Sequence, residues 1–411
     1  MNLKNVKSFL QYGYFMNYEK DDLPLEFSKI DKLIYTSLEE NELVNLGIEK
    51  FIEAISKDFE YNYQHVVPLS GGLDSRAILA ALLEFTDASN IFTYTFGTPG
   101  TLDYEIGGLI AKKAGTKHTN LPLTTHKYCQ DELIDISNRI NNQTMLFHHP
   151  PVWLVDELFS NHVVWSGYIG DLIVGGHLPT HPVTNLKDAK LKYLNKYKYV
   201  KSLSLSNIEN DFLIDYINFN TIDKKLVTYE EQILFNERVR KLTAPHVLIK
   251  GYNYKTPFIN NGFMDFMLSL DNRFRLGKYL FIEMMLKAFP KLFSQKTKNN
   301  YGLPLKSGNI KIEVKKIENK IKSFLGRSLN GFVNPYINYL DFRNGIRERE
   351  DLLSIFSSNI MDLKSRGIID WIDIEDILNR HLKKQGNFAD ALIVLTSLEI
   401  HLKAQTGWKT K

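Results

Sequence analysis

Short apolar runs alternate with helical patterns in the first half of the chain. The runs at residues 66–69, 91–97 and 163–165 are rich in β-branched and aromatic residues, which is typical of buried strands. Helical patterns follow the first two runs, over residues 77–83 and 103–114. Strands that alternate with helices predict a doubly wound parallel sheet, in which ligands bind beyond the carboxyl ends of the strands. The pattern therefore predicts an α/β fold with a ligand site at that edge.

Helical patterns are also expected at both ends of the chain. Apolar residues at helical spacing predict one helix over residues 43–59, which an aromatic segment at residues 9–15 precedes. The last hundred residues have the pattern of helices as well. We therefore expect an N-terminal segment with one helix over residues 1–60, the α/β domain over residues 61–310 and a helical C-terminal lobe over residues 311–411.

Composition narrows the class of protein only slightly. The 411 residues are 44% hydrophobic and carry a formal charge of +4, which is too small to indicate a nucleic acid or an anionic membrane as a partner. Cys129 is the only cysteine, which excludes an internal disulfide and a multi-cysteine metal site. No apolar run approaches the roughly 20 residues of a membrane span, and the start lacks the apolar region of a signal peptide. A cytoplasmic, soluble protein is expected.

The first apolar run leads through a glycine pair into a helix, with the sequence Ser-Gly-Gly-Leu-Asp-Ser at residues 70–75. Such a loop directs backbone N–H groups and the positive end of the helix dipole at one point, and the glycines let an oxyanion approach the main chain. The Lys-Ser/Thr pair of a kinase-type phosphate loop is absent, and an acid lies in the loop instead. An acid among phosphates indicates a bridging Mg²⁺. The candidate nucleotide-binding residues are Ser70, Gly71, Gly72, Asp74 and Ser75.

A second apolar run ends in a similar loop over residues 166–176. Ser166 and Gly167 are followed by an acid, Asp171, and the loop closes on a glycine pair. Two carboxylates that approach from separate loops suit the coordination of a hard cation. We therefore expect Asp74 and Asp171 to be ligands of Mg²⁺ and Gly167 to contact the nucleotide.

Both loops resemble those of the asparagine synthetase superfamily, whose members cleave ATP between its α and β phosphates. The resemblance extends to Gly97, near the adenine, and to Lys298, on a loop that reaches the reaction centre in the family. It implies that ATP and Mg²⁺ bind at the loops and that a substrate carboxylate attacks the α-phosphorus. The resulting acyl-adenylate would then react with an amine or ammonia.

The resemblance has two departures that bear on the reaction. The N-terminal aromatic segment resembles the linker that follows the glutaminase domain in asparagine synthetases. That domain's cysteine nucleophile would follow Met1, where this chain has Asn2, so we expect no glutaminase activity. In the second loop, Tyr168 stands where asparagine synthetases have an acid, which resembles β-lactam and carbapenam synthetases.

In those lactam-forming enzymes the tyrosine works with a glutamate as the base for an amine nucleophile, and Glu237 is the candidate partner here. The candidate catalytic residues are thus Lys298, Tyr168 and Glu237. The opposing interpretation is that Tyr168 packs beside the nucleotide and that Glu237 is a surface acid.

The resemblance implies an ATP-dependent carbon–nitrogen ligase that releases AMP and pyrophosphate. The expected partners are a small-molecule or peptide carboxylate and an amine or ammonia, together with a separate glutaminase or a substrate-carrier protein; no membrane partner is expected. Lysines and aromatic residues alternate over residues 186–202, which favours a solvated lid helix over a nucleic-acid surface.

Two alternatives remain for the function. A pyrophosphate-loop enzyme that activates a nucleic-acid base usually has further cysteines, which this chain lacks. An inactive nucleotide-binding scaffold would be expected to lose the loop acid or the lysine, and both are present.

Overall fold

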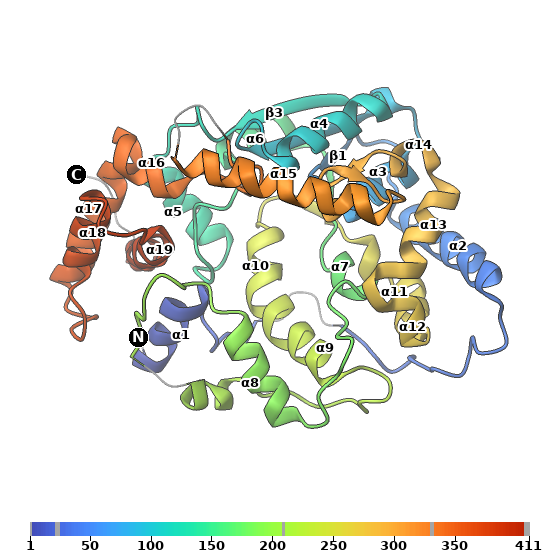
Figure 1. The fold of residues 1–411 in the computed structure, drawn as a ribbon, viewed down its shortest axis with the longest axis horizontal. Coiled ribbons are helices and arrows are strands. Elements are labelled where there is room, and N and C mark those ends of the chain that lie inside the picture. The colour runs from blue at the N-terminus through green and yellow to red at the C-terminus, as the bar shows by residue number, and fades with distance from the viewer. Residues whose placement is uncertain (1, 21–24, 208–209, 329–332, 407–411) are drawn as a thin grey trace.

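A parallel sheet of five strands, in the order β3-β2-β1-β4-β5, forms the centre of the computed structural model, which describes residues 2–20, 25–207, 210–328 and 333–406 (Figure 1). Its strands are β1 His65–Pro68, β2 Ile91–Gly97, β3 Lys117–Pro122, β4 Val163–Trp165 and β5 Asn253–Lys255. From β1 the chain proceeds outward to β3 and then adds β4 on the other side of β1. The predicted α/β fold with a parallel sheet is confirmed, and its strand order reverses between β1 and β4.

Helices connect these strands as the alternating pattern predicts. The connecting helices are α3 Asp74–Leu82, α4 Leu102–Ala114, α5 Gln130–Arg139 and α6 Val152–Phe159. The first of them is buried on most sides because it packs against both the sheet and α2 Glu40–Asp58. The predicted helix at residues 43–59 is therefore α2, displaced by a few residues.

The remaining elements form the lower and outer parts of the molecule in Figure 1. Short elements around the site are α7 Gly170–Ile173, α9 Tyr229–Ile233, α10 Ala244–Val247, the π-helix η3 Leu234–Thr243, η6 Lys298–Asn300 and the hairpin β6 Lys296–Thr297 with β7 Leu303–Pro304. The other helices are α1 Leu3–Tyr12, α8 Leu186–Lys196, α11 Asn261–Ser269, α12 Asn272–Arg275, α13 Tyr279–Ala288, α14 Pro290–Phe293, α15 Asn309–Ser328, α16 Phe342–Glu348, α17 Glu350–Ser365, α18 Ile374–Leu382 and α19 Ala389–Gln405. The predicted helix in residues 186–202 and the helical C-terminal region are present, and no helix of the described ranges is long and apolar enough to cross a membrane.

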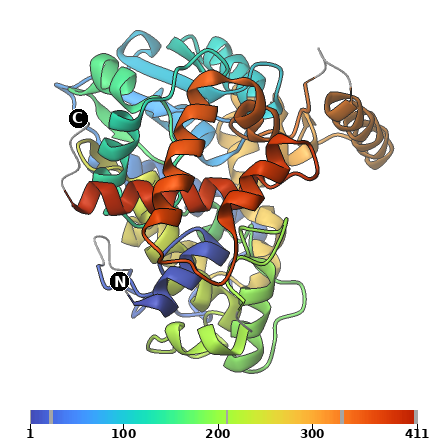
Figure 2. The ribbon, with the colours of Figure 1, turned by 90° about the vertical axis from the view of Figure 1, so that its left-hand side faces the viewer.

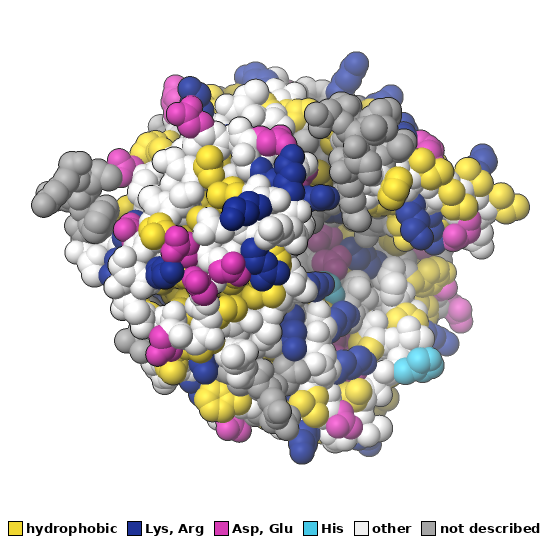
Figure 3. Space-filling view, turned by 60° about the vertical axis from the view of Figure 1, so that its left-hand side comes forward, with side chains coloured by type: hydrophobic (Ala, Val, Ile, Leu, Met, Phe, Trp, Pro, Cys, Tyr) yellow, Lys and Arg dark blue, Asp and Glu magenta, His cyan; other side chains and the backbone are white. Residues whose placement is uncertain are grey.

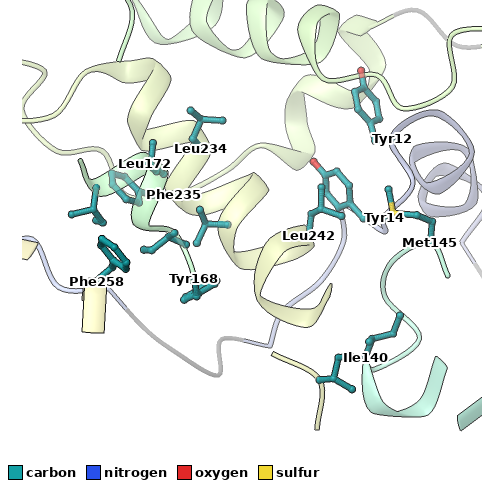
Figure 4. Close-up of a cluster of buried hydrophobic side chains, with 14 of the residues drawn as sticks. Tyr12, Tyr14, Ile140, Met145, Tyr168, Leu172, Leu234, Phe235, Leu242 and Phe258 are labelled. Atoms are coloured by element: carbon teal, nitrogen blue, oxygen red, sulfur yellow. The ribbon is translucent and has the colours of Figure 1, made fainter. Parts of the chain in front are cut away.

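One hydrophobic core crosses the boundaries expected from the sequence. It extends from Val6 in α1 to Ile400 in α19, and a separate small cluster joins alternate residues of the sheet, such as Val66 and Tyr94, to α6. The aromatic segment expected to resemble a linker belongs to this core, because Phe9, Tyr12 and Tyr14 are at most 1% exposed. Figure 4 shows part of the core, where aromatic and aliphatic side chains from distant segments lie together.

His401 links α19 to α5 and to the segment that follows it. Its Nδ1 atom lies 2.6 Å from the Ser137 hydroxyl, and its Nε2 atom lies 2.9 Å from the Thr144 carbonyl oxygen. The Nε2–H group donates to the Thr144 carbonyl oxygen, while Nδ1 faces the Ser137 hydroxyl. Burial lowers the pKa of His401 to about 4.

We predict that His401 makes the fold less stable in acid. Below about pH 6.5 the unfolded chain binds a proton at this residue, whereas the folded chain binds one only near pH 4. The free energy of unfolding should therefore fall as the pH drops through this window, by at most about 1.4 kcal/mol per pH unit.

Urea unfolding of His401→Gln between pH 7.5 and pH 5 measures this contribution. The variant should lose about 1–3 kcal/mol at pH 7.5 with its hydrogen bonds, and its stability should depend less steeply on pH below 6. The control is His181→Gln, at an exposed position. Parallel pH profiles for wild type and His401→Gln would contradict the prediction.

Candidate active site

A cavity of about 460 Å³ lies at the carboxyl ends of β1 and β4, where the strand order reverses. Its lining includes residues of both predicted loops, namely Ser70, Gly72, Asp74, Ser75, Ser166, Gly167, Tyr168 and Asp171. The surface in Figure 3 is hollowed, with acidic side chains deep inside and lysine and arginine side chains around the opening. The two loops thus face one cavity at the edge of the sheet that the fold class predicts.

The candidate phosphate-binding loop, residues 70–75, is hydrogen-bonded to a segment more than 200 residues further along the chain. The Gly71 carbonyl oxygen accepts hydrogen bonds from the Thr297 hydroxyl at 3.1 Å and from the Lys298 backbone N–H at 2.9 Å. A Cβ atom on Gly71 would lie 2.9 Å from the Cβ atom of Lys298, closer than side chains approach each other. A glycine is therefore required here, because the two backbones pack directly together.

Lys298 places its ammonium group beside this loop. The ammonium pairs with the Asp103 carboxylate and donates to the Asn338 amide oxygen at 2.8 Å. Asp103 lies in the first turn of α4, and its other oxygen accepts the Gly71 N–H at 3.1 Å. One carboxylate thus holds both the lysine and the loop, and 38% of the Lys298 side chain remains exposed.

Asp74 begins α3 and lines the cavity. Its Oδ1 atom is buried and has no hydrogen-bond partner among the described residues. Burial raises the pKa of Asp74 to about 6; the Lys278 ammonium opposes this rise and the Asp171 carboxylate adds to it. The second loop packs closely on this side chain, because a Cβ atom on Gly167 or Gly170 would lie 3.0 Å from Asp74.

Asp171 has the opposite electrostatic environment. One carboxylate oxygen pairs with the Lys278 ammonium, and the other lies 3.0 Å from His177 Nε2. Partial burial opposes the change, but these two partners lower the pKa of Asp171 to about 2. The structure therefore brings the two predicted metal ligands together but gives only Asp74 an oxygen without a partner.

The carboxylates of Asp74 and Asp171 suit a magnesium ion that arrives bound to a nucleotide. Within residues 2–20, 25–207, 210–328 and 333–406, no group of three or more His, Cys, Asp or Glu side chains could hold a metal ion. Mg²⁺ is commonly held by one or two carboxylates together with the phosphates of a substrate. The unpaired oxygen of Asp74 suits this arrangement, and a cation there would lower the raised pKa of its carboxyl group.

The rest of the cavity lining is mainly aromatic, and Arg238 is a charged residue in it. The His148 ring stacks on Tyr339 with centroids 4.6 Å apart, and the His149 and His246 rings lie 4.2 Å apart. Burial lowers the pKa of His148 to about 4 and that of His149 to about 3, so both rings are neutral at pH 7. The other aromatic residues of the lining are Tyr94, Phe96, Trp165, Tyr168, Tyr252 and Tyr254.

Residues 49–246 match the family model of asparagine synthase. The chain carries an asparagine synthase domain. A search of curated proteins found no match. The family consists of ATP-dependent enzymes, typically with Mg²⁺, so the general reaction is ATP-dependent formation of a carbon–nitrogen bond of the amide type. The matched segment contains both loops and Tyr168, whereas Lys298 lies beyond it.

At the predicted adenine position, the asparagine synthase domain is covered by a later segment. A Cβ atom on Gly97 would lie 3.2 Å from the Asn338 carbonyl oxygen. The Thr98 hydroxyl donates to the Tyr339 carbonyl oxygen at 2.7 Å, and the rings of Phe96 and Tyr339 stack with centroids 5.8 Å apart. A nucleotide base at Gly97 would therefore meet residues 338–339.

Glu237 lies away from the cavity of the asparagine synthase domain. Its side chain is fully buried and pairs with Lys241 at 2.7 Å, although its neighbour Arg238 lines the cavity. Burial raises the pKa of Glu237 to about 7, and the Lys241 ammonium opposes the rise. Glu237 is thus no surface acid, and the structure does not bring it into the cavity beside Tyr168.

Several site residues were not found from the sequence. Lys278 and His177 bind Asp171, and Asn338 binds Lys298, but none of them belongs to a recognisable motif. Asp103 belongs to the family resemblance together with Gly97, but that resemblance gave it no role in holding Lys298. Their roles arise from contacts between segments far apart in the sequence.

A buried ion pair supports the second loop. Arg275 Nη2 lies 2.7 Å from Glu231 Oε1, with both side chains fully buried, and the same nitrogen donates to the Ile173 carbonyl oxygen at 3.2 Å. A Cβ atom on Gly175 would lie 2.2 Å from the Arg275 carbonyl oxygen. The loop that carries Asp171 is therefore packed directly on Arg275.

Glu231→Gln should destabilise the fold by about 3–5 kcal/mol, because it leaves the Arg275 guanidinium buried without a counter-charge. Urea unfolding at pH 7.5 measures this loss. The matched control is Glu375→Gln, which removes a half-exposed partner of Lys364 and should cost no more than about 1 kcal/mol. Equal effects of the two replacements would show that Arg275 does not depend on Glu231.

Proposed function

We propose that the chain adenylates a carboxylate with ATP and transfers the acyl group to an amine. The observation that carries this proposal is that the glycine loop and the Asp74 carboxylate line one cavity, while the Lys298 backbone is hydrogen-bonded to the same loop and its ammonium is paired with Asp103, which also binds the loop. These groups are suited to phosphate, to a divalent cation and to developing negative charge, respectively. The asparagine synthase match supports the same class of reaction.

The phosphates of ATP would lie on residues 70–75, at the N-terminus of α3. Asp74 would hold Mg²⁺, and Asp171 would join it if one of its present partners gives way. Bound there, Mg²⁺ neutralises charge on the phosphates. An acid in place of the Lys-Ser/Thr pair supports cleavage between the α and β phosphates rather than transfer of the γ phosphate.

Lys298 would supply the positive charge that stabilises the negative charge formed during the reaction. Its ammonium is held beside the phosphate loop by Asp103 and Asn338, yet its side chain is still partly exposed. From this position it would stabilise the departing pyrophosphate and the charge on the tetrahedral intermediate. A charge that is held in place contributes most where the substrate's charge develops only in the transition state.

The aromatic wall favours a substrate with a largely uncharged body. Among the described residues that line the cavity, Arg238 is the one lysine or arginine. Free aspartate, with three charged groups, would find few partners on a wall of aromatic rings and neutral histidines. We therefore favour a carboxylate with a largely uncharged body, either a small molecule or part of a peptide.

Tyr168 is our candidate for the proton acceptor in the second half-reaction, in the phenolate form that it reaches by losing its own proton to water. It is 3% exposed and lines the cavity, and it belongs to the same buried cluster as Leu172, Leu234 and Phe258 (Figure 4). An amine is protonated at neutral pH and must lose a proton before it attacks, whereas adenylation of a carboxylate needs no such base. The two half-reactions should thus depend differently on the Tyr168 hydroxyl.

ATP turnover should yield AMP and pyrophosphate and should require Mg²⁺. The assay is exchange of radiolabelled pyrophosphate into ATP with a panel of carboxylates, followed by chromatography of the nucleotides. Lys298→Met should lower the exchange rate by about 100-fold or more. Lys296→Met, at an exposed position two residues away, is the control. Stoichiometric ADP and phosphate without AMP would rule out adenylation.

Tyr168→Phe should separate the two half-reactions. Pyrophosphate exchange should stay within about twofold of wild type, while amide formation should fall by about 100-fold or more, as expected for loss of a general base. Amide formation is followed by mass spectrometry with the carboxylate that gives exchange and a panel of amines. Equal loss of both activities, or of neither, would assign Tyr168 a packing role.

A further inference from the structure

α15 carries its apolar residues on the side that faces away from the protein. The stripe consists of Ile310, Val314, Ile317, Ile321 and Phe324, whose exposed fractions are 83%, 60%, 60%, 55% and 69%. The opposite side of the helix faces the body and is polar apart from Ile312, which is partly buried. There Asn319 is 2% exposed and donates to the Tyr301 carbonyl oxygen at 2.9 Å. The usual amphipathic arrangement is thus reversed.

The position of α15 leaves this stripe accessible. The helix lies across the outside of the molecule in Figure 1 and stands off from the body in Figure 2. In Figure 3, hydrophobic side chains gather along the right-hand edge. Isolated apolar side chains are common on surfaces, but a continuous row of five is typical of a surface that another molecule covers.

The spacing of the stripe fits another helix. Its members follow one another at intervals of four, three, four and three residues, which is the repeat of the a and d positions of a coiled coil. The four residues that flank this seam at the e and g positions are Lys311, Glu313, Glu318 and Lys320. In coiled coils, flanking charges of this kind select the partner and its direction.

We propose that the stripe pairs with the stripe of a second copy of this chain, in antiparallel orientation. When Ile310 lies opposite Ile321 and Val314 opposite Ile317, Lys311 of each copy meets Glu318 of the other. In the same register, Glu313 of each copy meets Lys320 of the other. The two-fold axis repeats each pair, so the flanking charges of the register attract one another throughout.

Other arrangements fit these charges less well. In a parallel pair, Glu313 of each copy would meet Glu318 of the other, which places like charges together twice. An anionic membrane surface would suit the lysines, but the same two glutamates border the stripe and would be repelled. The charge pattern therefore favours a second copy over a membrane.

The expected dimer is weak and depends on concentration. The stripe covers only about two heptads, which is short for a coiled coil of free peptides. However, α15 is already folded and held by contacts such as Asn319 to Tyr301. The free-energy cost of forming the helix is therefore not part of association. We expect dissociation in the micromolar range, where small changes in the flanking charges are measurable.

Sedimentation velocity of the full chain from about 1 to 100 μM tests the surface. Wild type should pass from monomer to dimer over this range. Ile317→Asp should stay monomeric throughout, whereas Leu33→Asp, at an apolar position that is 75% exposed elsewhere, should dimerise as wild type does. A wild type that remains monomeric, or a dimer that survives Ile317→Asp, would overturn the proposal.

The direction of pairing is tested with charges alone. Glu318→Lys should raise the dissociation constant roughly tenfold, because two attractive pairs become repulsive. Adding Lys311→Glu to that variant should restore wild-type dimerisation, since the charges are then exchanged. A parallel pair predicts the opposite, namely that Glu318→Lys strengthens the dimer.

Circular dichroism checks that α15 persists in these variants, because Glu318 also pairs with Lys315 and Lys322 within the helix. Co-sedimentation of wild type with phosphatidylcholine–phosphatidylserine vesicles completes the test. Binding to vesicles that Ile317→Asp abolishes, without any dimer in solution, would assign the stripe to a membrane and overturn the proposal.

Discussion

The backbone of Gly71 joins the phosphate loop to the segment that carries Lys298, and the geometry of the site depends on this junction. Its carbonyl oxygen accepts two hydrogen bonds from residues 297 and 298, and its N–H donates to Asp103, which also holds the Lys298 ammonium. Residues from three separate regions of the chain thus meet at one peptide unit. A side chain at position 71 would push these backbones apart and move the ammonium away from the loop.

The loops could be predicted from the sequence because their signals are local. A strand, a glycine pair and a helix with an acid in its first turn lie within a few residues, and the same is true of the second loop. Lys278 and His177 could not be found in this way, because a lysine or a histidine in an ordinary sequence becomes a partner of Asp171 only through folding. The strands and helices of the sheet were predictable for the same local reason, whereas the common core of α1 and α19 was not.

Glu237 illustrates a second limit of prediction from sequence. It was chosen because it lies in the right interval of the chain, but neighbouring residues on a helix face different directions. In the π-helix η3, Arg238 lines the cavity while Glu237 points into the core toward Lys241. A π-helix has i to i+5 hydrogen bonds, so it also presents its residues in an order that α-helical spacing does not describe. Position along the chain therefore could not decide which residue faces Tyr168.

The two acids of the site are in opposite electrostatic states. Asp171 is compensated by Lys278 and His177, which lower its pKa to about 2, while burial and the charge of Asp171 raise the pKa of Asp74 to about 6. The uncompensated negative charge at the cavity is therefore mainly that of Asp74. A cation that arrives with a nucleotide would find its strongest attraction at this carboxylate, and it would gain more there than at Asp171, where it must compete with an ammonium already in place.

Residues 338–339 contact both Gly97 and Lys298, the two predicted ends of the nucleotide site. The Asn338 carbonyl oxygen lies over Gly97, where the family resemblance places the adenine, and the Asn338 side chain accepts a hydrogen bond from Lys298. A base that binds at Gly97 would displace this residue, and the same displacement would break its bond to the ammonium. Lys298 would then keep only Asp103 as a partner and could turn toward the phosphates. Binding of a nucleotide base at Gly97 would thus also release the Lys298 ammonium from Asn338, because the same asparagine contacts both Gly97 and Lys298.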